Sequence, residues 1–182
     1  MRFRSDKRPR PPLDQEGLER LALFYAGRYA STRAKLAAYL RRKIKDRGWA
    51  GPAEAPVERL VERLVERFAE LGYVDDRAFA SARAASLLQR GYGARRVGEA
   101  LRAAGIGEDD GAEARALADE EALAAAHRFA RRRRLGPYAD SPPDREARQK
   151  WAAAMLRAGH RIELVRRVLE TSPADLPEPD VP

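Results

Sequence analysis

Several residue types that would indicate chemistry are absent from this chain or rare in it. There is no cysteine, which excludes disulfides and thiol catalysis and fits a reducing compartment. The two histidines, His127 and His160, do not fall in any metal-ligand pattern. No apolar run approaches the roughly 20 residues that span a bilayer, and the basic N-terminus is not followed by an apolar segment. We therefore expect a soluble, cytoplasmic protein without a signal peptide or a membrane contact.

Candidate catalytic groups are equally scarce. Asp75 and Asp76 form the only tight acid pair in a motif context, but neighbouring side chains point in different directions. One of them is better placed to cap the helix expected to begin near Arg77. Gly91 and Gly93 lack the preceding strand and the following Lys-Ser/Thr of a phosphate loop. We therefore expect neither an enzyme nor a bound cofactor or metal.

The chain is rich in helix-forming and in basic residues. Hydrophobic residues make up 44% of the 182 residues and charged residues 35%, with Ala, Leu, Arg and Glu dominant. The net charge is +8 and the isoelectric point about 10.2. A basic protein of this kind favours a polyanionic partner, either nucleic acid or an acidic protein surface.

Apolar residues recur at helical spacing, with almost no strand alternation. The pattern repeats and predicts an all-α fold of three tandem three-helix repeats that are helix-turn-helix-like. Each repeat has a glycine that ends its middle helix, at Gly48, Gly105 and Gly159. Ser31 and Ser141 are the expected caps of the middle helices in the first and third repeats. The expected organisation is a disordered basic arm (1–14), repeats 1 (15–72), 2 (73–118) and 3 (119–170), and a disordered tail (171–182).

Charge alternates along the chain, with net values of +7 for residues 28–48, −4 for 53–76, +4 for 83–102 and −6 for 108–121. Basic middle helices of this kind can contact phosphates or acidic protein, or can simply be packing helices with a solvated face. The arginine run at 131–134 also fits a helix C-terminus, which favours cations. The candidate contact residues are Arg41, Arg42, Lys43, Lys45, Arg90, Arg95, Arg96, Arg102, Arg131, Arg132, Arg133 and Arg134.

The helix in the centre of repeat 2 has an expected inner and outer face. Val97 and Leu101 share the inner face, whereas Arg95 and Arg102 are two turns apart and share an outer one. Sequence-specific reading of DNA bases is disfavoured, because the middle helices contain no Asn and only Gln149. Non-specific phosphate contact is the better interpretation.

Four motifs, in order, carry a family resemblance: GYVDDRAFA at 72–80, RGYGARRV at 90–97, LRAAGI at 101–106 and the segment from 156 to 170. Together they resemble the RecX family of bacterial regulators of the RecA recombinase. Tyr73 and Tyr92 are expected to anchor the small core beside their turn glycines. The motif residues expected to shape the fold are Gly72, Tyr73, Asp75, Asp76, Phe79, Gly91, Tyr92, Gly93, Leu101 and Gly105.

The resemblance implies a curved, elongated arrangement of the three repeats. It also implies a partner, the RecA–DNA filament, and inhibition of the recombinase, ATPase and coprotease activities of RecA, which modulates DNA repair and the SOS response. Single- and double-stranded DNA are further candidate partners, and a monomer is expected. Two alternatives remain open: a DNA-binding architectural or transcription regulator that acts without RecA, and a helical scaffold with another protein partner.

Overall fold

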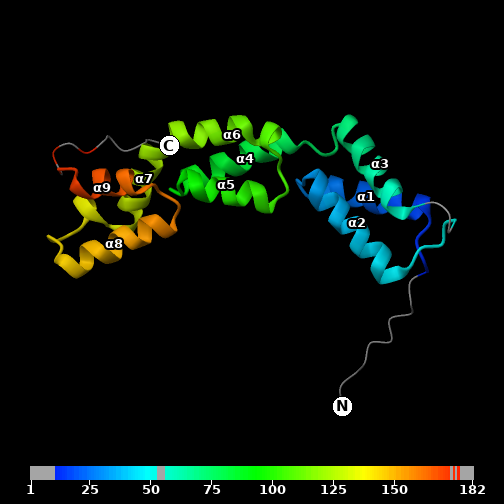
Figure 1. Ribbon diagram of the computed structural model, residues 1–182, viewed down its shortest axis with the longest axis horizontal. Coiled ribbons are helices and arrows are strands. Elements are labelled where there is room, and N and C mark those ends of the chain that lie inside the picture. Colours follow the sequence, from blue (N-terminus) through cyan, green and yellow to red (C-terminus); the bar gives the residue numbers. More distant parts are fainter. Residues whose placement is uncertain (1–10, 53–55, 173, 175, 177–182) are drawn as a thin grey trace, which may run out of the picture. The chain divides into compact units, whose positions relative to one another are not determined.

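The computed structural model describes residues 11–52, 56–172, 174 and 176. Regular structure in these residues is helical, apart from one isolated bridge between Leu13 and Trp49 (Figure 1). The helices are α1 (Gln15–Arg28), α2 (Arg33–Arg47), α3 (Val57–Glu70), α4 (Asp76–Gln89), α5 (Ala94–Ala103), α6 (Glu108–Glu120), α7 (Ala122–Arg133), the 3₁₀ turn η1 (Gly136–Tyr138), α8 (Arg145–Arg157) and α9 (Ile162–Glu170). The all-α prediction is confirmed.

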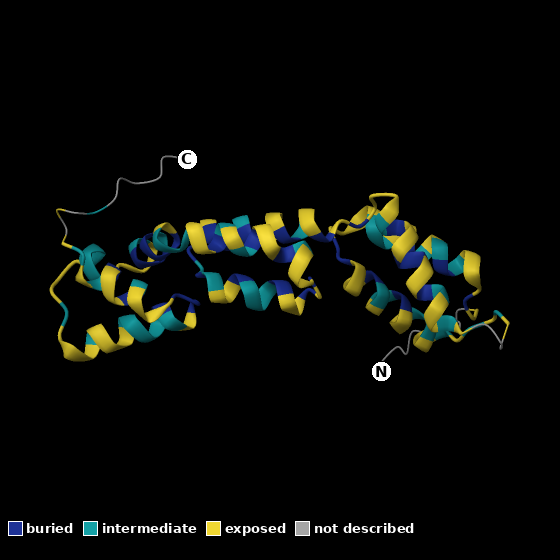
Figure 2. Cartoon of the chain, turned by 45° about the horizontal axis from the view of Figure 1, so that its top comes forward, coloured by how far each residue is buried: buried dark blue, intermediate teal, exposed yellow. Residues whose placement is uncertain are grey.

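The chain divides into two compact units, residues 1–76 and 77–182. The first unit has one apolar core, formed by α1, α2 and α3. The second has two, one built mainly by α4, α5 and α6 and the other by α7, α8 and α9. Buried residues lie where the helices of each unit face one another, and exposed residues cover the outer sides (Figure 2). Three groups of three helices are consistent with the predicted repeats, whereas the curved, elongated arrangement stays a prediction.

The first unit begins before α1. Leu13 is only 1% exposed, and its backbone pairs with the loop after α2, donating to Gly48 and accepting from Ala50. Asp14 then caps α1 by accepting from the amide of Gly17 at 2.8 Å. The ordered chain therefore includes part of the segment expected to be a disordered arm. Residues 1–10 of that arm, and most of the expected tail, lie outside the described residues.

The start of α2 is held by two side chains. Thr32, rather than the expected Ser31, is the cap, and its hydroxyl accepts from the amide of Lys35 at 3.2 Å. The carboxylate of Asp76 accepts from the amide of Arg33, the first residue of α2, at 2.9 Å. The expectation that Asp75 or Asp76 caps the helix near Arg77 stays a prediction; α4 begins at Asp76, whose side chain is buried. In the third repeat, Asp144 caps α8 in place of the expected Ser141.

In the second unit, α6 passes almost directly into α7. Glu121 is the single residue between them, and the guanidinium of Arg128 binds its carboxylate at 2.6 Å. Ala125 packs into the core of α4, α5 and α6, while Ala126, the next residue, packs into the core of α7, α8 and α9. Arg128 also donates to the carbonyl of Leu88 at the end of α4. One bent helical segment therefore joins the two cores.

A second joint between these cores is made by backbone against backbone. The amide of Gly93 donates to the carbonyl of Ala158, and the amide of Arg95 to that of Gly159. A Cβ atom on Gly93 would lie 2.3 Å from the Gly159 oxygen, and one on Gly159 would lie 2.5 Å from the Arg96 nitrogen. Only glycine fits at either position, because the two turns approach too closely for a side chain.

The glycine turns behave largely as predicted. Gly48, Gly105 and Gly159 follow the ends of α2, α5 and α8 with positive φ angles of 84°, 76° and 95°. Tyr92 is partly buried against both cores of the second unit, as expected of an anchor. Tyr73 is not: its side chain is 50% exposed and lies over Phe68, because the chain leaves α3 through an exposed turn.

Candidate binding surface

The twelve basic candidates differ in what they contact. Four are already bound to oxygen atoms of the fold. Arg41 pairs with Glu58 of α3 at 2.7 Å, which links two helices of the first unit. The other three are in the second unit: Arg95 donates to the Leu156 carbonyl at 2.6 Å, Arg96 pairs with Glu99 at 3.4 Å, and Arg134 pairs with Asp140 at 3.0 Å.

Six more of these cations lie over aromatic rings. Cation–ring contact holds a guanidinium or ammonium group at the surface without neutralising its charge. The pairs are Arg42 and Lys43 over Tyr39, Arg90 over Tyr92, Arg131 over Tyr138, and Arg132 and Arg133 over Phe129, with distances to the ring centres of 5.2 to 5.8 Å.

Lys45 and Arg102 are the most open candidates. Both side chains are exposed, and neither makes a hydrogen bond or ion pair with the described residues. Val97 and Leu101 are fully buried, which confirms the predicted inner face of α5. Arg95 and Arg102 are not equivalent, however. Arg95 binds a carbonyl in the last turn of α8, so it stabilises the joint of the second unit as well as carrying charge.

The first unit has an aromatic feature that was not predicted from the sequence. Phe24, Tyr25 and Tyr29 lie at the end of α1, and Tyr39 lies in α2; we call these four residues the aromatic row. The rings of Tyr25 and Tyr39 are stacked, with centres 4.2 Å apart and an angle of 17° between planes. The available signal was a clustering of aromatic and basic residues from 20 to 45, a stretch without a single acid.

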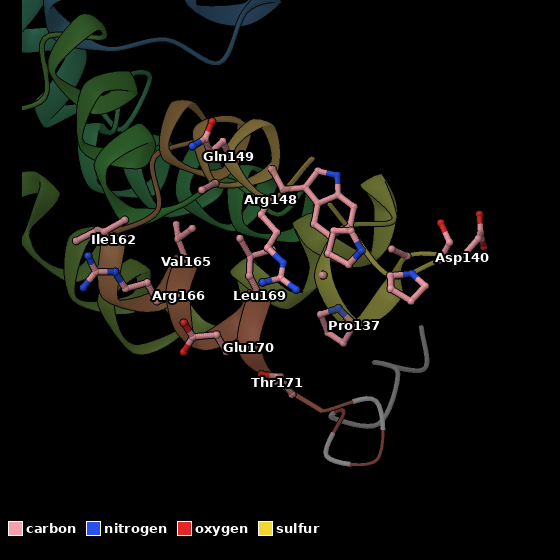
Figure 3. A pocket seen from close by; sticks show the side chains of 17 residues that line it. Pro137, Asp140, Arg148, Gln149, Ile162, Val165, Arg166, Leu169, Glu170 and Thr171 are labelled. Carbon is pink, nitrogen blue, oxygen red and sulfur yellow. The ribbon is translucent and has the colours of Figure 1, made fainter. Parts of the chain in front are cut away.

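A hollow with a volume of about 790 Å³ lies between η1, α8 and α9 in the third repeat (Figure 3). Apolar side chains dominate its lining, and two guanidinium groups lie among them. It contains no histidine. Across the described residues, no three His, Cys, Asp or Glu side chains are arranged to hold a metal ion. The lining includes Pro137, Trp151, Ile162, Val165 and Leu169 together with Asp140, Arg148, Arg166 and Glu170.

Both histidines are structural and are kept neutral by their surroundings. Burial lowers the pKa of His160, and its hydrogen bond to the Gly91 carbonyl offsets this only in part. Because a carbonyl accepts, Nε2 carries the proton, and Nδ1 is buried without a partner among the described residues. Burial also lowers the pKa of His127, helped by the charges of Arg131 and Arg167. Neither histidine adds charge to the basic surface near neutral pH.

Comparison with known proteins identifies the family. The regulatory protein RecX of Myxococcus xanthus (strain DK1622) is 36% identical over 176 residues, which cover 94% of this chain and 93% of that protein. The chain belongs to the RecX family. No family model matches the sequence. The resemblance expected from the four motifs is therefore confirmed by an alignment along nearly the whole chain.

Two solved RecX structures share the fold of this RecX-family chain. The crystal structure of RecX from Lactobacillus salivarius aligns with a TM-score of 0.67 and 16% identity, over 86% of this chain and 94% of its own. A second RecX crystal structure aligns with a TM-score of 0.64 and 20% identity, over 86% and 72% of the two chains. No described helix is long and apolar enough to cross a membrane.

Proposed function

We propose that this RecX-family chain is a regulator that binds the RecA–DNA filament and inhibits the recombinase, ATPase and coprotease activities of RecA. It would thereby modulate DNA repair and the SOS response. The observation that carries the proposal is the 36% identity, over 94% of the chain, with a regulatory protein RecX. The fold shared with two RecX crystal structures supports it.

The regulator acts by binding and has no chemical step of its own. Its contact groups are the basic side chains of α2, α5 and α7, which suit DNA phosphates or acidic protein surface. Lys45 and Arg102 are the clearest of these, because the fold leaves both charges open. Arg41, Arg95, Arg96 and Arg134 contribute less, since each is already engaged by a carboxylate or a carbonyl.

Inhibition follows from many modest contacts on two units of one chain. Each unit has a core of its own, and the covalent link gives the second unit a high effective concentration once the first is bound. A chain held along the filament in this way blocks access of a second DNA strand or favours loss of RecA subunits.

The test is a titration of the protein into RecA, single-stranded DNA and ATP while ATP hydrolysis is followed. We expect hydrolysis to fall with added protein and the effect to weaken as salt is raised. Undiminished hydrolysis and strand exchange at a several-fold excess over RecA would contradict the proposal.

A pair of charge reversals locates the contact. Lys45→Glu with Arg102→Glu places one reversal in each unit and should raise the concentration needed for inhibition several-fold. The matched control is Arg59→Glu with Arg63→Glu, which changes the net charge equally but on the acidic helix α3. If both variants lost inhibition equally, the effect would come from the net charge of the protein and not from contacts made by Lys45 and Arg102.

The alternative, a DNA-binding regulator independent of RecA, predicts that a RecA filament adds nothing to the affinity of the protein for DNA, whereas the main proposal predicts tighter binding to the filament than to bare DNA. The acid-free basic stretch from 20 to 45 is the observation that favours the alternative. Under the main proposal, the degree of inhibition at a fixed DNA concentration depends on the ratio of this protein to RecA. Excess DNA without RecA should not compete away binding of the protein to the filament.

A further inference from the structure

The end of α1 and the first three turns of α2 combine positive charge with aromatic rings. Between residues 20 and 45 there is no acidic residue, and there are eight basic ones. The four aromatic side chains of this stretch are the aromatic row defined above. A polyanion is therefore the partner that its charge selects.

The rings and cations form one continuous series of contacts. The guanidinium of Arg28 lies 5.9 Å from the ring centre of Tyr29, and the Tyr29 ring lies 5.4 Å from that of Tyr25. Tyr25 stacks on Tyr39. The ammonium group of Lys43 lies 5.4 Å from the Tyr39 ring and the guanidinium of Arg42 lies 5.8 Å from it. Cations thus lie at both ends of a run of three rings.

The inner and outer rings of the row have different surroundings. Tyr25 and Tyr39 are partly buried against the core of the first unit, which fixes their position. Phe24 is 60% exposed and Tyr29 is 50% exposed, so both present ring surface to solvent. Phe24 is one helical turn before Arg28, and Gly27 between them has open space where a side chain would lie. An exposed aromatic surface beside open cations is typical of proteins that stack unpaired bases.

We propose that the aromatic row is a binding site for single-stranded nucleic acid. Unpaired bases stack on Phe24 and Tyr29, while Arg28, Arg42 and Lys43 contact the phosphates. Duplex DNA does not fit this site, because its bases are stacked on one another and leave no ring surface free. An acidic protein would satisfy the cations but gives no reason for exposed rings among them. This inference shares with the proposed function only the premise that the chain contacts nucleic acid.

The test measures binding of labelled oligonucleotides to the full-length protein in the absence of RecA, so this proposal and the RecA proposal can fail separately. The probes are oligo(dT), oligo(U), an abasic strand of equal length and a duplex with the same number of phosphates. We expect oligo(dT) to bind at least five-fold more tightly than the abasic strand, since stacking on one ring is worth about that factor or more. Comparison with oligo(U) shows whether the strand is DNA or RNA.

The variants are Phe24→Ala and Tyr29→Ala, singly and combined. Each single change should weaken oligo(dT) binding about five-fold or more and leave binding to the abasic strand nearly unchanged. The matched control is Tyr73→Ala, because Tyr73 is also 50% exposed in the first unit but lies outside the row. Circular dichroism of all variants should show the helix content and melting temperature of the parent protein.

Several results would overturn the proposal. Equal affinity for oligo(dT) and the abasic strand would mean that only phosphates are bound. Equal losses in the row variants and in Tyr73→Ala would mean that the row has no special part. If the double variant binds oligo(dT) normally but no longer inhibits RecA, or if it loses self-association seen in the parent, the exposed rings contact protein instead.

Discussion

Gly93 and Gly159 meet backbone to backbone, so at this joint a single carbon atom matters. The φ angle of Gly93 is −81°, which alanine adopts freely, and the cost of Gly93→Ala therefore comes from the contact alone. We expect it to lower the free energy of unfolding of the second unit by about 1–3 kcal/mol. Urea denaturation followed by circular dichroism measures the change.

Gly98→Ala is the matched control, five residues further along in α5. Its added Cβ meets nothing closer than a terminal nitrogen of Arg102 at 3.5 Å. Because alanine is the better helix former, we expect this variant to gain up to about 1 kcal/mol. If both variants lost stability equally, the close approach at Gly93 would not be the cause.

His160 makes the second unit sensitive to acid. Its pKa is lowered from 6.5 in the folded protein by burial, and a second proton would lie on Nδ1, which has no acceptor among the described residues. Above about pH 7 the histidine is neutral in both states. As the pH falls through 6.5, His160 becomes protonated in the unfolded chain but stays neutral in the folded chain. The free energy of unfolding therefore decreases.

The variant His160→Gln isolates this effect. Glutamine keeps a nitrogen donor for the Gly91 carbonyl but does not titrate. We expect the loss of stability between pH 7 and pH 5 to be smaller in the variant than in the parent, with the remainder partly due to His127. An equal loss in both proteins would remove His160 as its source.

At the scale of helices, α2 depends on a carboxylate from a distant part of the sequence. Removing it by Asp76→Asn weakens a charge-assisted hydrogen bond at the positive end of the α2 dipole. We expect the first unit to lose about 1–2 kcal/mol. Asp46→Asn, an exposed change in the last turn of the same helix, should cost nothing measurable. Melting temperatures of both variants, compared with that of the parent protein, measure the difference.

The glycine stops of these helices were predictable, whereas two of the expected caps and the contacts between helices were not. The stops at Gly48, Gly105 and Gly159 follow from short-range backbone geometry, which a sequence shows directly. The partner of Asp76 is 43 residues away and leaves no local pattern. The aromatic row was missed for the same reason: Tyr25 and Tyr39 stack only because particular faces of α1 and α2 meet.

The sequence shows which basic residues are candidates for binding, but it does not show which of them are engaged within the fold. All twelve basic candidates belong to charged stretches that the sequence displays. Only the structure separates Arg95, which holds the end of α8, from Arg102, which is open. Charge reversal at Arg95 therefore tests the joint and the binding together, whereas reversal at Arg102 tests binding alone.

At the scale of the whole chain, we expect the two units to unfold independently. Asp76→Asn acts on the first unit and Gly93→Ala on the second, and the two compact units have separate cores. Hydrogen exchange followed by mass spectrometry should show faster exchange in residues 15–70 for the first variant and in residues 77–170 for the second. Faster exchange throughout the chain in either variant would show one cooperative unit.

Because α6 continues almost directly into α7, the number of residues in this segment determines how the two cores of the second unit are oriented. Each residue in a helix turns the chain by about 100° and advances it by about 1.5 Å. One residue inserted or deleted near Glu121 would therefore rotate the α7–α9 core away from the glycine contact that fixes it independently. Substitutions on the exposed side of this segment should be harmless, but changes in its number of residues should not be tolerated.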